Sequence, residues 1–126
     1  MKKIFIADDR NSNYIALKTA FEELIPECRL MYASNGREMV DLVSKEKPDL
    51  ILMDMLMPLM DGIQATQELR KKYSKQELPI IAMTAQDKTA VRQVVIDSGC
   101  NEYLIKPYTL QELMEKVNLY LGDGKS

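Results

Sequence analysis

Acidic, hydroxyl and amine side chains stand at the ends of four short apolar runs in this sequence. Asp8 and Asp9 follow the first of five such runs, and Asp54 follows the third. Thr84 follows the fourth run and Lys106 follows the fifth. Ligands of an open α/β sheet bind outside the carboxyl ends of its strands. If the runs are parallel strands, three carboxylates, a hydroxyl and an ammonium therefore meet at one edge of a sheet.

Three carboxylates that lie together call for a cation, because like charges at close range resist ionisation. Mg²⁺ prefers a few carboxylate oxygens completed by water, and Mn²⁺ suits the same ligands. Asp8, Asp9 and Asp54 are the expected ligands, with a nearby backbone carbonyl as a further one. The spacing does not resemble a helix–loop–helix calcium loop, which argues against Ca²⁺.

A carboxylate beside such a cation can attack a phosphoryl group and form an acyl phosphate. Asp54 is the expected nucleophile because it stands alone after the central run, whereas the tandem Asp8 and Asp9 suit metal binding. Phosphoryl transfer is catalysed mainly by positioning and charge neutralisation. The cation and Lys106 would stabilise the phosphoryl oxygens, and Thr84 would donate a hydrogen bond to one of them.

Composition is that of an ordinary globular domain and excludes several kinds of chemistry. The 126 residues are 46% hydrophobic and 29% charged, and a net charge of −2 gives no basic footprint for nucleic acid. The absence of histidine rules out Ser-His-Asp and Cys-His catalysis and most zinc sites. Two distant cysteines, no signal peptide and no stretch of transmembrane length predict a cytoplasmic protein that is not bound to membranes.

Five apolar runs alternate with five amphipathic stretches. The runs predict strands at Ile4–Ala7, Arg29–Ala33, Leu50–Met53, Ile80–Met83 and Tyr103–Ile105, of which the second is mixed and suits a sheet edge. Apolar residues three and four apart predict helices over residues 14–24, 39–43, 63–69, 91–95 and 110–120, with Asp61 capping the third. This order predicts a flavodoxin-like three-layer α/β fold, with five parallel strands in the order 2-1-3-4-5. Residues 1–121 form one domain, and residues 122–126 are expected to be a loose tail.

Four motifs together resemble the receiver domain of bacterial-type response regulators along the whole chain. They are residues 6–9, residues 48–58 with 60–62, residues 81–85 and residues 103–107. Each motif alone is weak, but the four in this order are specific. In sequence, these motifs are most similar to the receiver domains of hybrid sensor kinases and to single-domain phosphorelay regulators.

The resemblance implies a Mg²⁺-dependent aspartyl phosphate in a two-component system. Asp54 would be the phosphoacceptor, while Asp8 and Asp9 would bind the metal with help from the carbonyl of Leu56. Ala85 would be small so that the phosphoryl group can approach the backbone. The donor would be a phosphohistidine on a histidine kinase or a histidine phosphotransfer protein.

The resemblance also implies a signalling switch rather than an enzyme. Thr84 would move towards the phosphoryl group while the ring of Tyr103 turns inward. These movements would reshape the surface of the fourth helix, fifth strand and fifth helix for a downstream protein. Lys106–Pro107 would carry a cis peptide bond. A monomer or weak dimer is expected.

Two positions depart from polar choices that are common in the family. Leu56 cannot orient an attacking water and Gln86 carries no charge, so we expect a comparatively long-lived acyl phosphate.

Three other classes of protein stay open as alternatives. A dehalogenase-type phosphohydrolase would have an aspartate where Leu56 stands, and a small flavoprotein would have a phosphate-binding loop where Asp8 and Asp9 stand. A degenerate receiver would bind partners without being phosphorylated.

Overall fold

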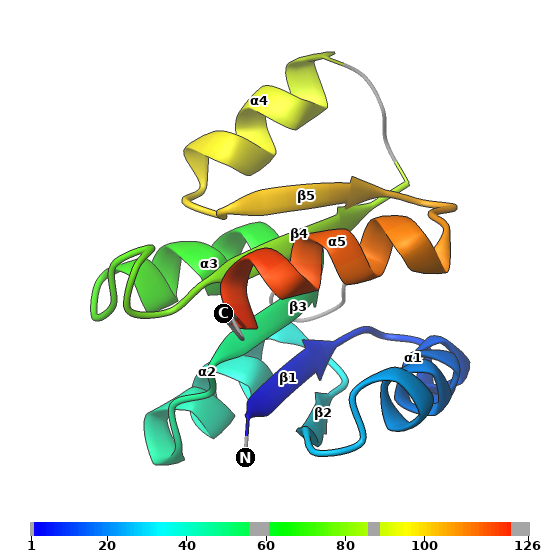
Figure 1. Cartoon of the computed structure of the whole chain (residues 1–126). Coiled ribbons are helices and arrows are strands. Elements are labelled where there is room, and N and C mark those ends of the chain that lie inside the picture. Colours follow the sequence, from blue (N-terminus) through cyan, green and yellow to red (C-terminus); the bar gives the residue numbers. More distant parts are fainter. Residues whose placement is uncertain (1, 56–60, 86–88, 122–126) are drawn as a thin grey trace.

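Five parallel strands form a central sheet with helices on both faces (Figure 1). The structure, a computed structural model, describes residues 2–55, 61–85 and 89–121. The strands are β1 Lys3–Ala7, β2 Arg29–Ala33, β3 Leu50–Asp54, β4 Ile80–Thr84 and β5 Glu102–Ile105. The helices are α1 Asn11–Leu24, α2 Gly36–Lys45, α3 Gly62–Arg70, α4 Thr89–Asp97 and α5 Leu110–Leu121.

The strand order is β2-β1-β3-β4-β5, which confirms the predicted flavodoxin-like topology. The all-apolar runs are the inner strands: every residue of β3 and β4 is buried. By contrast β2 and β5, at the two edges, are mostly half-buried. Strands covered on both faces are apolar throughout, whereas strands at a sheet edge can also carry polar residues.

Alternate residues of each strand point to opposite faces and fill two separate cores. Phe5 and Ile51 pack with residues of α2, α3 and α4 on one face. Ile4 and Leu52 pack with residues of α1 and α5 on the other. The two cores hold the sheet rigidly from both sides, so the carboxyl ends of β1, β3 and β4 are fixed relative to one another.

Helices α2 and α3 begin with the capping groups that their sequences provide. The Asn35 side chain accepts a hydrogen bond from the Glu38 amide (2.9 Å). Asp61 accepts one from the Gln64 amide (2.9 Å), while the Gln64 side chain accepts one from the Asp61 amide (3.1 Å). This reciprocal pair is a capping box, and it confirms Asp61 as the N-cap of α3.

Helices α1 and α2 begin three residues before their first apolar marker, because polar first turns carry no hydrophobic signal. The predicted tail, residues 122–126, lies outside the described residues. Within the described ranges, no helix is both long enough and apolar enough to cross a lipid bilayer.

Candidate functional site

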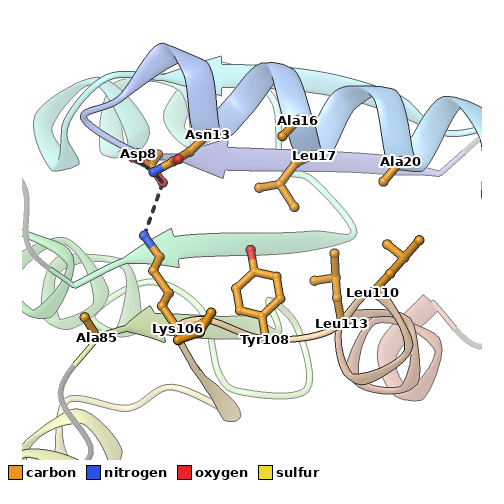
Figure 2. Close-up of a pocket in the computed structure, with 11 residues that line it drawn as sticks. Asp8, Asn13, Ala16, Leu17, Ala20, Ala85, Lys106, Tyr108, Leu110 and Leu113 are labelled. Atoms are coloured by element: carbon orange, nitrogen blue, oxygen red, sulfur yellow. Dashed lines mark hydrogen bonds and ion pairs between the residues drawn. The ribbon is translucent and has the colours of Figure 1, made fainter.

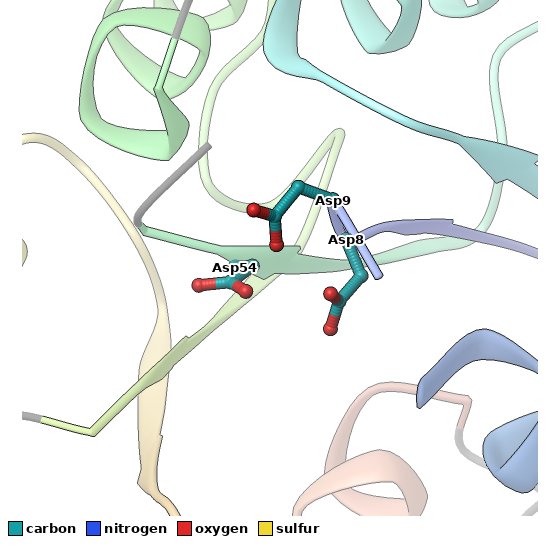
Figure 3. Close-up of side chains that lie close together, drawn as sticks. All are labelled: Asp8, Asp9 and Asp54. Atoms are coloured by element: carbon teal, nitrogen blue, oxygen red, sulfur yellow. The ribbon is translucent and has the colours of Figure 1, made fainter. Parts of the chain in front are cut away.

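Three carboxylates converge at the carboxyl edge of the sheet, as predicted (Figure 3). Asp8 and Asp9 follow β1, and Asp54 is the last residue of β3. Each of the three offers an oxygen that lies within 4.8 Å of the others'. Asp8 and Asp54 are buried, whereas Asp9 is exposed. A hard divalent cation fits this donor set, because it prefers carboxylate oxygens and can complete its shell with water from the open side.

Asp8 is oriented by its surroundings. Its Oδ1 accepts a hydrogen bond from the Arg10 amide (2.9 Å), and the Asn13 side-chain nitrogen lies 3.3 and 3.2 Å from the two carboxylate oxygens. The Asp8 amide donates to the Ala33 carbonyl of the neighbouring strand (3.1 Å). Asn13 is not among the predicted site residues. It lies in the first turn of α1, and its contact with Asp8 depends on how α1 packs after β1.

Lys106 supplies the positive charge at this edge. Its Nζ lies 3.2 Å from Asp54 Oδ2 and 3.5 Å from Asp8 Oδ2. The residue directly follows β5, and its amide donates to the Thr84 carbonyl (2.7 Å). The Lys106–Pro107 peptide bond is cis, as expected from the resemblance. The ammonium group thus lies where it offsets the clustered carboxylates and would also meet a phosphoryl oxygen on Asp54.

Thr84 is the last residue of β4, the strand next to the central one, and Ala85 directly follows it. Asp54 is opposite Met83 in the register, so Thr84 lies one residue further along at the same edge. Thr84 is buried and Ala85 is exposed. The backbone thus brings the predicted hydroxyl and the predicted small residue to the edge that carries Asp54.

Tyr103 lies apart from the acidic cluster, opposite Ala82 in the register. Its ring is half-buried, and the guanidinium carbon of Arg92, on α4, lies 5.5 Å from the ring centroid. Such a separation is typical of a cation–π contact. The predicted carbonyl ligand from Leu56 and the uncharged Gln86 both lie outside the described residues.

A groove of about 590 Å³ runs from the cluster between α1 and α5 (Figure 2). Asp8 and Lys106 lie at one end of it, and small or apolar residues of the two helices line the rest. Tyr108 projects into the groove, and its hydroxyl donates to Met83 Sδ (3.5 Å). Burial first, and then the charges of Asp8 and Asp54, raise the pKa of Tyr108 to about 12, so the phenol stays neutral.

The sequence profile described as "response regulator receiver domain" matches residues 4–118. The chain belongs to this family. Among curated proteins, the receiver domain is 36% identical over 89 residues to response regulator MprA of Mycolicibacterium vanbaalenii. That match covers 71% of this chain and 38% of the relative, so the chain spans well under half of that relative's length.

Solved structures agree with the assignment. The receiver domain of the Pseudomonas aeruginosa PAO1 sensor histidine kinase PA1611, solved with a magnesium ion in its active-site cleft, is 29% identical with a TM-score of 0.86. The match covers 96% of this chain and 98% of that one. The receiver domain of Francisella response regulator 1452 is 32% identical (TM-score 0.85), over 95% of this chain and 96% of that one. The receiver domain of Saccharomyces cerevisiae Ssk1, co-crystallised with the histidine phosphotransfer protein Ypd1, is 27% identical (TM-score 0.84), over 94% of this chain and 88% of that one.

Proposed function

We propose that this receiver domain takes a phosphoryl group from a phosphohistidine onto Asp54 and holds it as a signal. The observation that carries the proposal is the Asp54 carboxylate at a strand end, with Lys106 Nζ at 3.2 Å and two further carboxylates beside it. Family membership supports the same reading. A carboxylate in these surroundings suits accepting a phosphoryl group, because the incoming charge meets an ammonium at once.

The reaction is a single transfer between two atoms. An Asp54 carboxylate oxygen attacks phosphorus, the new P–O bond forms, and the P–N bond to the donor imidazole breaks. The imidazole nitrogen keeps the electron pair of the broken bond and takes a proton from solvent, so the donor ring leaves as neutral imidazole. Mg²⁺, held by Asp8, Asp9 and Asp54, would neutralise charge on the phosphoryl oxygens. Lys106 contacts Asp54 already and would shift its hydrogen bonds to the transferred group.

The test is a mass measurement on the chain with a small donor. Incubation with acetyl phosphate and MgCl₂ should add the mass of one phosphoryl group, and EDTA should prevent the gain. Release of phosphate far beyond one equivalent per chain from a phosphomonoester would instead favour a phosphohydrolase. No gain of mass under any condition would favour a degenerate receiver that works by binding alone.

The proposed donor docks along the groove between α1 and α5. A protein donor has to bring its histidine to Asp54, and the groove is an apolar surface that ends at Asp8 and Lys106. On the α1 side of the groove, the small side chains of Ala16 and Ala20 leave room for a partner's side chains. The yeast neighbour crystallised with a histidine phosphotransfer protein supports this class of partner.

Enlarging Ala16 should block a protein donor and spare a small one. Ala16 is exposed and lines the groove, so Ala16→Arg should lower the rate of transfer from a phosphorylated histidine phosphotransfer domain about tenfold. Phosphorylation by acetyl phosphate should change much less. Ala90→Arg, on an exposed position of α4 over the other face, is the matched control. Equal rates for both variants with the protein donor would place docking elsewhere.

The proposed switch would be read out through Tyr103. Its half-buried ring lies under Arg92, so an inward turn of the ring would break the cation–π contact. Movement of Thr84 towards the phosphoryl group is the event that would drive this turn. The surface of α4, β5 and α5 would then present a different face to a downstream protein.

A further inference from the structure

Tyr32 makes a hydrogen bond that has no role in the phosphoryl transfer proposed above. It is the penultimate residue of the edge strand β2 and pairs with Ile6 of β1. Its hydroxyl donates to the backbone carbonyl of Asp8 (2.8 Å). A side chain of a neighbouring strand thus reaches over to the backbone of a metal-binding residue.

The Tyr32 side chain is held in place from the helix side. Its ring packs against the ring of Tyr14, on α1, with centroids 4.6 Å apart and planes tilted by 31°. This spacing is within the range of favourable aromatic pairs. The hydroxyl therefore has little freedom to leave the Asp8 carbonyl, and it acts as a fixed donor.

The bonded carbonyl belongs to the peptide group that joins Asp8 to Asp9. The orientation of this peptide sets the direction in which the Asp9 side chain leaves the backbone. On its other side, the Asp8 amide is tied to the Ala33 carbonyl (3.1 Å). Two successive residues of β2 therefore fix the backbone of the acidic pair, one through its side chain and one through its main chain.

We propose that Tyr32 is a positioning residue for the divalent cation: its hydroxyl holds the Asp8–Asp9 peptide so that both carboxylates face Asp54. The inference rests on the proposed function, because it assigns Tyr32 a task in the same site. Groups that orient metal ligands from behind contribute to metal affinity without touching the ion. Of the three aspartates, Asp9 should depend most on this hydrogen bond for its orientation, because Asp9 is exposed whereas Asp8 and Asp54 are buried.

The experiment is a titration of the Tyr32→Phe variant with MgCl₂, followed by the amide signals in ¹H–¹⁵N spectra. Phenylalanine keeps the ring against Tyr14 and removes only the hydroxyl. The Mg²⁺ dissociation constant should rise about two- to tenfold, the range that corresponds to one lost hydrogen bond. At saturating MgCl₂, phosphorylation by acetyl phosphate should return to nearly the wild-type rate, because the defect lies in binding the cation.

Tyr120→Phe is the matched control. It also removes one tyrosine hydroxyl, which donates to Glu102 Oε2 (3.2 Å) near the start of β5, at the opposite edge of the sheet. The Mg²⁺ dissociation constant of this variant should equal that of the wild type. An unchanged dissociation constant in Tyr32→Phe, even with lower thermal stability, would overturn the inference and leave Tyr32 a packing residue. Failure of the wild type itself to bind Mg²⁺ would instead overturn the proposed function.

Discussion

Replacing Asp54 by asparagine is expected to abolish the gain of a phosphoryl group from acetyl phosphate in the presence of MgCl₂. The amide lacks the negative charge that attacks phosphorus, and it cannot form the acyl phosphate. Asparagine is nearly the same size and can still accept a hydrogen bond from Lys106. Loss of the reaction would therefore reflect chemistry at residue 54 and not a change in packing. Intact mass of the two proteins after incubation measures the effect.

Asp49→Asn is the matched control for this experiment. Asp49 directly precedes the first residue of the same strand, and its Oδ2 accepts a hydrogen bond from the Lys3 amide (2.8 Å). We expect this variant to gain one phosphoryl group as the wild type does. A persistent gain in Asp54→Asn would move the acceptor to Asp8 or Asp9. In that case the assignment of metal ligand and nucleophile would have to be exchanged.

The second large effect is expected at Gly62, the first residue of α3. A Cβ atom there would overlap the carbonyl oxygen of Asp54 and would lie 2.9 Å from the Cα of Met55. Both are backbone atoms, so neither can turn aside as a side chain would. Gly62→Ala should lower the free energy of unfolding by about 1–3 kcal/mol, as overpacking of a buried position does. Urea denaturation followed by circular dichroism measures this loss.

Gly62→Ala should also disturb the functional site, because the carbonyl oxygen that the new Cβ atom would overlap belongs to Asp54 itself. We expect slower phosphorylation of the folded Gly62→Ala variant by acetyl phosphate. Gln67→Ala, at an exposed position of the same helix, should change the free energy of unfolding by less than about 0.5 kcal/mol and leave phosphorylation unchanged. Wild-type stability in Gly62→Ala would show that α3 can shift away from β3 at little cost.

The fold could be predicted because its main signal is local. The runs that become β3 and β4 are apolar throughout, and that pattern alone distinguishes strands covered on both faces. The end of a run also marks the end of a strand, which is why the pattern of runs alone places Asp54, Thr84 and Lys106 at one edge. Parallel strands make this possible, since all their carboxyl ends face the same way.

The groups that support the site could not be predicted in the same way. Tyr32 and Asn13 both act on Asp8, yet each looks like an ordinary residue of its own strand or helix. Their roles depend on where a side chain points after β1, β2 and α1 have packed together. Arg92 is a similar case: its contact with Tyr103 joins α4 to β5, and nothing in either segment alone indicates it.

The ion pairs of Lys106 with Asp8 and Asp54 join segments that are made at very different times. Asp8 follows β1 and Lys106 follows β5, the first and the last strand in chain order. A chain leaving the ribosome therefore exposes Asp8, Asp9 and Asp54 well before Lys106 has been synthesised. Only a molecule whose sheet has closed with β5 holds the complete charge arrangement. The proposed phosphorylation of Asp54 therefore needs a molecule in which β5 has already joined the sheet.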